Sequence, residues 1–242
     1  MKLRLAFLYV MMMVSWMNDL LDLLFPRCCV MCGKRLAKAE EHICVSCSRE
    51  LPRTYYCKEP DNPLAKSFWG RATVERAAAY FYYYKDNAAC RILYTLKYYN
   101  CPEIGVYMGK QMAGEINRSG FFQQIDVLIP VPLASKKRKK RGYNQCEKLA
   151  EGISYVTSIP VDTTSLIRRV ANPTQTRKRR MERWENVQGI FSVVSPEKLV
   201  GKHVLLIDDV VTTGATLISC MDALSVIPQL QVSVLTLAVA RE

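Results

Sequence analysis

Acidic residues are scarce in this chain relative to basic ones. Its 242 residues include 34 lysines and arginines but only 22 aspartates and glutamates, which gives a formal net charge of +12. Most of the surplus lies in two short runs, residues 136–141 and 177–183. Basic charge gathered in this way favours a polyanionic ligand, either a pyrophosphorylated sugar or a nucleic acid, although two solvated loops would explain the same runs.

A hydrophobic run long enough to cross a membrane is also missing. The apolar stretch at residues 5–17 has 13 residues, whereas a spanning helix needs about 20. Lys2 and Arg4 precede it as in a secretory signal peptide, but no small-residue cleavage site follows. We therefore interpret residues 1–16 as an over-extended reading frame, expect the natural protein to begin at Met17, and expect a cytoplasmic protein without a membrane span.

Two common phosphate-binding fingerprints are absent from the stretch with the clearest motif, residues 203–217. It reads HVLLIDDVVTTGATL: an apolar strand, two acids, a hydroxyl-rich turn and a renewed apolar pattern. No lysine follows Gly214 as in a Walker loop, and the G-x-G-x-x-G spacing of dinucleotide sites does not occur here. The order of residues predicts a different strand, turn and helix site.

The predicted turn carries the groups that a phosphorylated sugar needs. Unpaired N–H groups and the positive end of the helix dipole favour a phosphate at a helix N-terminus. Thr212, Thr213 and Thr216 add hydroxyl donors, while Asp208 and Asp209 can accept hydrogen bonds from adjacent sugar hydroxyls. We predict a ribose 5-phosphate site; the alternative is an ordinary turn in which an aspartate only caps the helix.

The ten cysteines have the spacing of a metal site more than that of a disulfide framework. Two C-x-x-C pairs separated by eleven residues can place four thiolates around one zinc ion, which would hold together a segment too short for its own core. The predicted ligands are Cys29, Cys32, Cys44 and Cys47. Cys28 can replace Cys29 in this pattern, and redox-active or merely buried cysteines are the alternative. We expect His42 to be a surface residue.

Short strands alternating with helices predict an α/β domain with a parallel sheet and right-handed crossovers. The expected strands cover residues 75–84, 126–132, 159–166, 189–194, 203–207 and 232–239. The expected helices cover residues 89–97 and 104–116, a segment starting near 144, and a segment after the threonine-rich turn. We expect loops at residues 136–141 and 170–186.

The motifs occur in the order seen in one known family. The cysteine pairs, YTLKYYN around Lys97, IPVPLASKKRKKRGYNQCEKLA and DDVVTTGATL resemble ComF-type proteins, which are competence-associated homologues of type I phosphoribosyltransferases. The resemblance covers nearly all of residues 24–240. It implies a type I phosphoribosyltransferase-like parallel sheet flanked by helices, with a small N-terminal zinc ribbon. The implied parts are an uncertain lead-in at 1–23, the ribbon at 24–58 and the phosphoribosyltransferase-like domain at 75–242.

The resemblance also implies a site for phosphoribosyl pyrophosphate (PRPP), with Mg²⁺ accompanying this ligand. The residues implied to bind PRPP are Asp208, Asp209, Val210, Val211, Thr212, Thr213, Gly214, Ala215 and Thr216. Those of the pyrophosphate loop are Pro132, Leu133, Ala134 and Ser135. The candidate catalytic residues are Lys97, Arg177 and Arg183. Residues 170–186 would form a lid over the site.

Three functions are compatible with this resemblance. The protein either transfers a phosphoribosyl group from PRPP to a nitrogen acceptor, or serves as a non-catalytic, nucleic-acid-handling component of DNA uptake. The partners expected for the second function are single-stranded DNA or DNA-uptake proteins, with the basic runs contacting phosphates. The third function is that of a PRPP-responsive regulator. No residue identifies the acceptor or a general base.

Overall fold

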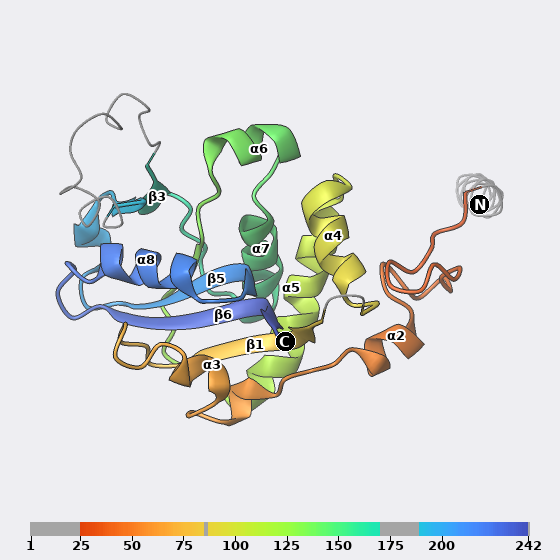
Figure 1. The fold of residues 1–242 in the computed structure, drawn as a ribbon, viewed down its shortest axis with the longest axis horizontal. Helices are drawn as coiled ribbons and strands as arrows, with labels where there is room; N and C mark the ends of the chain where they lie inside the picture. Colours follow the sequence, from red (N-terminus) through yellow and green to blue (C-terminus); the bar gives the residue numbers. More distant parts are fainter. Residues whose placement is uncertain (1–24, 85–86, 170–188, 242) are drawn as a thin grey trace, which may run out of the picture. The chain divides into compact units, whose positions relative to one another are not determined.

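The computed structural model describes residues 25–84, 87–169 and 189–241, and the chain divides into two compact units between Leu51 and Pro52 (Figure 1). Helix α2 (Val45–Glu50) belongs to the first unit. The second unit has helices α3 (Pro63–Lys66), α4 (Cys90–Tyr98), α5 (Pro102–Ile116), α6 (Ser135–Arg141), α7 (Gln145–Thr157) and α8 (Ala215–Leu224), and 3-10 helices η1 (Tyr56–Lys58), η2 (Asn117–Ser119) and η4 (Pro196–Leu199). Its strands are β1 (Ala77–Tyr83), β2 (Val127–Pro130), β3 (Leu166–Arg168), β4 (Phe191–Val193), β5 (His203–Val211) and β6 (Gln231–Ala240).

A parallel sheet with the order β1-β6-β5-β2 forms the centre of the second unit. Strand β5 lies between β6 and β2, with Ile207 opposite Leu235 on one side and Pro130 on the other. Its residues from Val204 to Ile207 are fully buried, as expected for a strand covered on both faces. The structure confirms the predicted α/β class, and the parallel arrangement places the carboxyl ends of β2 and β5 at the same edge.

Helices α5 and α7 pack side by side through glycines, which allow their backbones to approach closely (Figure 1). A methyl group at Gly152 would lie 2.1 Å from the carbonyl oxygen of Val106, and one at Gly109 would lie 2.3 Å from that of Leu149. Helix α7 begins at its predicted start, because the Asn144 side chain accepts a hydrogen bond from the N–H of Cys146. The glycine contact with α5 therefore fixes the position of α7, whose first turn reaches the edge of the sheet.

The basic run at residues 136–141 was predicted to be a loop, and this prediction is wrong, because the run forms helix α6. Lysine and arginine are good helix formers, so six in succession support a helix even without an apolar stripe. Gly142 ends the helix in the left-handed region, with a φ of 83°. Arg138 also pairs with Glu147 of α7 at 2.9 Å. The positive charges are therefore held on an ordered element.

Two of the expected strands differ from the structure. Residues 159–166 do not form one strand: Val161 makes a single bridge to Leu128, and Asp162 then accepts hydrogen bonds from the N–H groups of Thr164 and Ser165, which turns the chain. The expected strand at 189–194 shortens to β4, which pairs antiparallel with β3 in a separate two-stranded sheet. The Asp162 side chain thus binds backbone N–H groups that a continuous strand would need, and the chain turns instead.

The predicted start at Met17 and the predicted lid at residues 170–186 lie outside the described residues. Within the described part of the chain, none of the helices combines the length and the apolar character that crossing a membrane requires.

We expect Gly152→Ala to lower the free energy of unfolding by about 1–3 kcal/mol, because the added methyl group meets the backbone oxygen of Val106 and the two helices must separate. Gly114→Ala is the matched control: nothing lies within 4 Å of a methyl group at this α5 position, so the variant should be up to about 1 kcal/mol more stable than the parent. Denaturant unfolding of both variants measures the difference. Equal midpoints would contradict the proposed tight contact.

Candidate functional site

The two acids were predicted to follow a strand at residues 203–207, but β5 continues through them to Val211. Both are buried near the carboxyl edge of the sheet. Asp208 and Asp209 are 8% and 4% exposed. The N–H of Asp209 donates to Asp208 Oδ1 at 2.8 Å, and the Cys146 thiol lies 3.4 Å from the same oxygen. Lys97, a candidate catalytic residue from α4, places its Nζ 3.0 Å from Asp209 Oδ2. Three separate elements therefore meet at one pair of carboxylates.

Burial controls the protonation of this cluster. Burial raises the pKa of Asp208 to about 7, and the adjacent charge of Asp209 adds to the shift. Burial and the two aspartates also raise the pKa of Cys146 well above its usual value, so that its sulfur stays protonated and can donate to Asp208. The site is thus a poorly solvated acidic pair that is stabilised by two hydrogen-bond donors and one lysine.

The threonine-rich turn lies next to the acids and faces solvent. Thr212, Thr213 and Thr216 are exposed, whereas Gly214 is buried and has a φ of 74°. A methyl group at Gly214 would lie 3.2 Å from Phe68 Cε1, so both the backbone conformation and the contact favour glycine. Helix α8 starts immediately afterwards, and its first N–H, that of Ala215, makes only a long contact of 3.4 Å to Thr213 Oγ1. The turn therefore presents the start of a helix to an incoming anion.

A pocket of about 230 Å³ joins these features. Of the predicted site residues, it is lined by Lys97, Pro132, Leu133, Asp208, Asp209, Val210 and Thr216. Sequence reasoning did not assign site roles to Tyr98, Gln145, Cys146 or Arg168, which also line it. The remaining predicted residues of the turn and of the pyrophosphate loop do not line this pocket: Val211, Thr212, Thr213, Gly214, Ala215, Ala134 and Ser135. Val211 and Thr212 line a separate pocket of about 360 Å³ instead. Arg177 and Arg183 lie outside the described residues.

The missed residues come from elements that the chain brings together only on folding. Cys146 lies in the first turn of α7 and is buried, at 1% exposure, with its sulfur 3.4 Å from Asp208 Oδ1. Its position two residues after the Asn144 cap was the available signal, because the start of α7 points at the carboxyl edge of the sheet. Tyr98 follows Lys97 on α4, so the placement of the lysine brings the tyrosine with it.

The first unit contains the second candidate site, a cluster of four cysteines. The sulfur atoms of Cys29, Cys32, Cys44 and Cys47 all lie within 4.8 Å of one another. The distance between the sulfurs of Cys32 and Cys44 is 3.8 Å, close to the roughly 3.8 Å expected between two thiolates that bind one zinc ion tetrahedrally at about 2.3 Å. The four cysteines are therefore positioned to bind a metal ion, and the set fits structural zinc.

Local backbone geometry explains why these four cysteines converge. Gly33 has a φ of 74° and donates its N–H to the carbonyl of Cys29, which closes the first turn. Burial raises the pKa of Cys29, but N–H groups directed at its sulfur, chiefly that of Cys44, lower the pKa to about 7. Cys28 lies apart from the cluster, exposed and directed at the carbonyl of Pro26, so the structure favours Cys29 over it.

These observations define a class of protein. Its members have a cysteine ribbon followed by a parallel α/β unit with a buried acidic pair at the carboxyl edge of the sheet. Residues 20–73 match the family model of the double zinc ribbon domain. The chain is 26% identical over 202 residues to DNA utilization protein YhgH of Salmonella typhimurium, with 79% of this chain and 87% of the relative covered. It is 28% identical over 189 residues to competence protein ComFC of Bacillus subtilis, covering 78% and 74%.

A shorter match supports the same relationship. Competence protein F of Haemophilus influenzae is 36% identical over 94 residues, which cover 38% of this chain and 41% of that protein. The comparisons confirm the predicted resemblance to ComF-type proteins.

Among solved structures, glutamine phosphoribosylpyrophosphate amidotransferase from Bacillus subtilis is 20% identical with a TM-score of 0.41, covering 58% of this chain and 30% of the other. Leishmania donovani UMP synthase is 17% identical with a TM-score of 0.35, covering 73% and 30%.

We expect one zinc ion per chain, bound by the four clustered cysteines, and we expect Cys47→Ser to lose it. The serine removes one of four soft ligands from a buried position. Cys28→Ser is the matched control and should keep the metal, because Cys28 lies outside the cluster. Elemental analysis of the purified full chains measures the metal content. Loss of zinc from Cys28→Ser, but not from Cys47→Ser, would contradict this ligand set.

The raised pKa of Asp208 predicts a pH-dependent cost of folding. The folded protein holds this proton up to about pH 7, whereas the unfolded chain releases it near its ordinary pKa of about 4. Because the folded state then binds more protons, this group lowers the free energy of unfolding as the pH rises between these values. Asp208→Asn should remove that slope and should be more stable than the parent above pH 7, by roughly 1–3 kcal/mol.

The matched control for this titration is Asp222→Asn, which changes an exposed acid on α8. Denaturant unfolding at several pH values between 4 and 8 gives the difference between each variant and the parent. If Asp208→Asn and Asp222→Asn follow the same pH dependence, the buried aspartate does not titrate as described.

Proposed function

We propose that the pocket at the carboxyl edge of the sheet binds PRPP with Mg²⁺ and that the protein transfers its phosphoribosyl group to a nitrogen acceptor. The observation that carries this proposal is the convergence of a buried acidic pair, a lysine 3.0 Å from it and an exposed helix-starting turn around one pocket. A sugar with a vicinal diol and a terminal phosphate matches both halves of that arrangement.

The acids and the turn would contact different parts of the phosphorylated sugar. Asp208 and Asp209 accept hydrogen bonds from the two adjacent ribose hydroxyls, which also relieves their mutual repulsion in a poorly solvated site. The 5-phosphate lies over the turn at residues 212–216, where the start of α8 and the exposed threonines donate to it. These contacts would fix the ribose ring relative to the sheet.

The pyrophosphate group would lie on the side of the pocket formed by β2, α4 and α6. Pro132 and Leu133 line this side together with the basic residues Lys137 and Arg141. Lys97, which pairs with Asp209, would exchange this contact for one with a pyrophosphate oxygen. Mg²⁺, when bound with PRPP, supplies further positive charge to the leaving group. The described residues therefore provide orientation and charge neutralisation.

The reaction is a displacement at carbon 1 of the ribose. A bond forms between the acceptor nitrogen and carbon 1, the bond between carbon 1 and the pyrophosphate oxygen breaks, and the acceptor loses one proton. Positive charge that develops on the ring is stabilised by the nearby carboxylates, whose position is fixed before the reaction begins. We assign positioning and electrostatic roles to the named residues and leave the proton acceptor unassigned.

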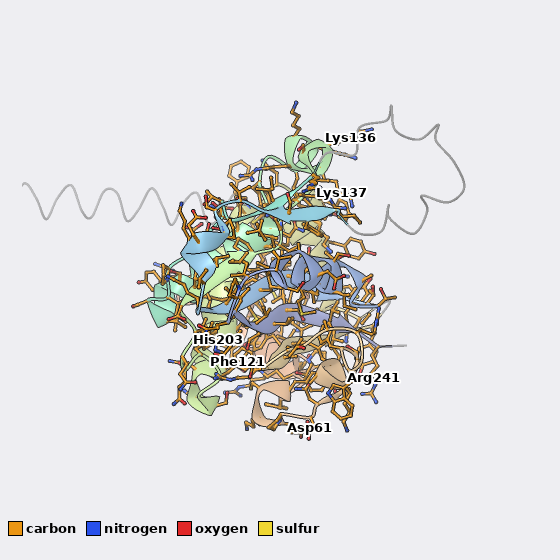
Figure 2. The ribbon with its side chains drawn as sticks, turned by 90° about the vertical axis from the view of Figure 1, so that its left-hand side faces the viewer. Asp61, Phe121, Lys136, Lys137, His203 and Arg241 are labelled. Carbon is orange, nitrogen blue, oxygen red and sulfur yellow. The ribbon has the colours of Figure 1, made fainter. Side chains whose placement is uncertain are left out.

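A second candidate function is the handling of nucleic acid during DNA uptake. Relatives are named competence protein and DNA utilization protein, and helix α6 carries six consecutive basic residues on one ordered element. Figure 2 shows Lys136 extending from α6 away from the body of the second unit. In this function the protein would act in the cytoplasm on a strand, with the unit that ends at Leu51 and the unit that begins at Pro52 as separate parts.

We expect calorimetric titration with PRPP and Mg²⁺ to show one site per chain, and Asp208→Asn combined with Asp209→Asn to weaken it at least a hundredfold. Two charge-assisted contacts to the diol are lost, at roughly 1.5–3 kcal/mol each. Asp222→Asn removes one exposed negative charge from α8, outside the pocket, and serves as the control. Unchanged affinity in the double variant would contradict the assignment of the diol site.

The same proteins test turnover. Release of pyrophosphate in the presence of a panel of nitrogen heterocycles should occur with the parent and with Asp222→Asn, but not with the double aspartate variant. PRPP binding without pyrophosphate release for any acceptor would favour the non-catalytic function.

A further inference from the structure

A second, larger pocket adjoins the PRPP pocket and is strongly basic. Its volume is about 470 Å³. Its lining includes Lys97, Lys137, Lys139, Lys140 and Arg141. In the described part of the chain, neither Lys139 nor Lys140 makes an ion pair, whereas Arg138 of the same helix pairs with Glu147. Figure 2 shows the solvent-facing end of this helix, where Lys136 and Lys137 are labelled. Lys139 and Lys140 therefore bring unpaired positive charge to the pocket, in addition to Lys97, which pairs with Asp209.

Three exposed tyrosines lie on α4 or directly after it, and one of them, Tyr98, lines the basic pocket. Tyr94 and Tyr98 of α4 are 50% and 68% exposed, and their ring centres are 6.0 Å apart with planes inclined by 34°. Tyr99 is 73% exposed, and the Arg141 guanidinium carbon lies 6.0 Å from the centre of the Tyr98 ring. Aromatic rings that stay in solvent beside lysines offer stacking surfaces for bases next to cations for phosphates. This combination selects a single strand, because the bases of a duplex are not free to stack on protein.

The basic pocket and the PRPP pocket share a wall. Lys97, Tyr98, Lys137 and Arg141 line both of them. The cations that neutralise pyrophosphate in the proposed function are thus the same ones that a strand phosphate would contact. Two polyanions cannot both form full ion pairs with the same few cations. Each ligand must therefore weaken the binding of the other, and by an equal factor.

We propose that the pocket between α4 and α6 binds a single nucleic-acid strand, and that PRPP and the strand exclude each other through the shared wall. This inference rests on the proposed binding of PRPP. Occupancy of the sugar phosphate site then determines whether the protein holds or releases a strand. Lys139 and Lys140 line only the basic pocket, so they separate the two sites experimentally.

The test measures binding of a fluorescent oligodeoxythymidylate of about 12 nucleotides to the full chain by anisotropy, with PRPP and Mg²⁺, or pyrophosphate and Mg²⁺, added in steps. We expect saturating PRPP or pyrophosphate to weaken strand binding at least tenfold. We expect Lys139→Ala combined with Lys140→Ala to weaken strand binding about tenfold, to leave calorimetric PRPP affinity unchanged, and to reduce the slope of log affinity against log salt by about 1.4. Lys198→Ala with Lys202→Ala, which alters two exposed lysines elsewhere, is the matched control.

Each outcome is decisive. If calorimetry shows PRPP bound while strand affinity stays the same or rises, the exclusion is wrong although the proposed function stands. If PRPP does not bind, the proposed function fails, and displacement of the strand by pyrophosphate still tests the shared wall. Tighter binding of the duplex of the same length, or equal losses in the two lysine variants, would overturn the assignment of a single strand to this pocket. In the double aspartate variant the strand should bind normally and PRPP should no longer displace it.

Discussion

The burial of two adjacent carboxylates at the end of β5 is the constraint on which the second unit depends. Placing Asp208 and Asp209 out of water costs free energy. The N–H of Asp209 reduces this cost, and so do two groups from other elements, the Lys97 ammonium from α4 and the Cys146 thiol from α7. Helices α4, α5 and α7 therefore have to hold fixed positions relative to the sheet. The glycine contact between α5 and α7 provides this for the helix that carries Cys146.

This arrangement leaves the site incompletely neutralised by the protein itself. One lysine faces two acids, and the pKa of Asp208 rises because burial and its neighbour both disfavour its charge. A ligand that brings hydroxyl donors stabilises the carboxylates, whereas a purely anionic ligand does not. The same pocket is also lined by two basic residues, the exposed Lys137 and the half-buried Arg141. A molecule with a diol at one end and phosphates at the other fits this gradient of charge.

Local sequence order made part of the site predictable. The acids and the threonine turn are consecutive, so the pattern of strand, acids and turn identifies them without tertiary information, and the two C-x-x-C pairs identify the cysteine cluster in the same way. Tyr98 and Arg168 were not assigned because α4 and β3 reach the pocket only through packing. Helix α6 was mistaken for a loop because it has no apolar stripe; its order comes from the helix propensity of lysine and arginine, the left-handed Gly142 and the pair between Arg138 and Glu147. The strand expected at 159–166 failed because Asp162 binds the backbone that a strand needs.

Phe68 gives the stretch that follows the ribbon a structural role of its own. Its ring is 1% exposed and lies so close to Gly214 that a single added carbon would crowd it. The stretch containing α3 thus supports the threonine-rich turn at residues 212–216, although the matched ribbon model extends through this stretch to residue 73. The boundary between the two units consequently lies between Leu51 and Pro52. Exchanging the ribbon at this boundary would leave Phe68 in contact with the turn, whereas exchanging it at residue 73, the end of the matched segment, would remove Phe68 and its support of the turn.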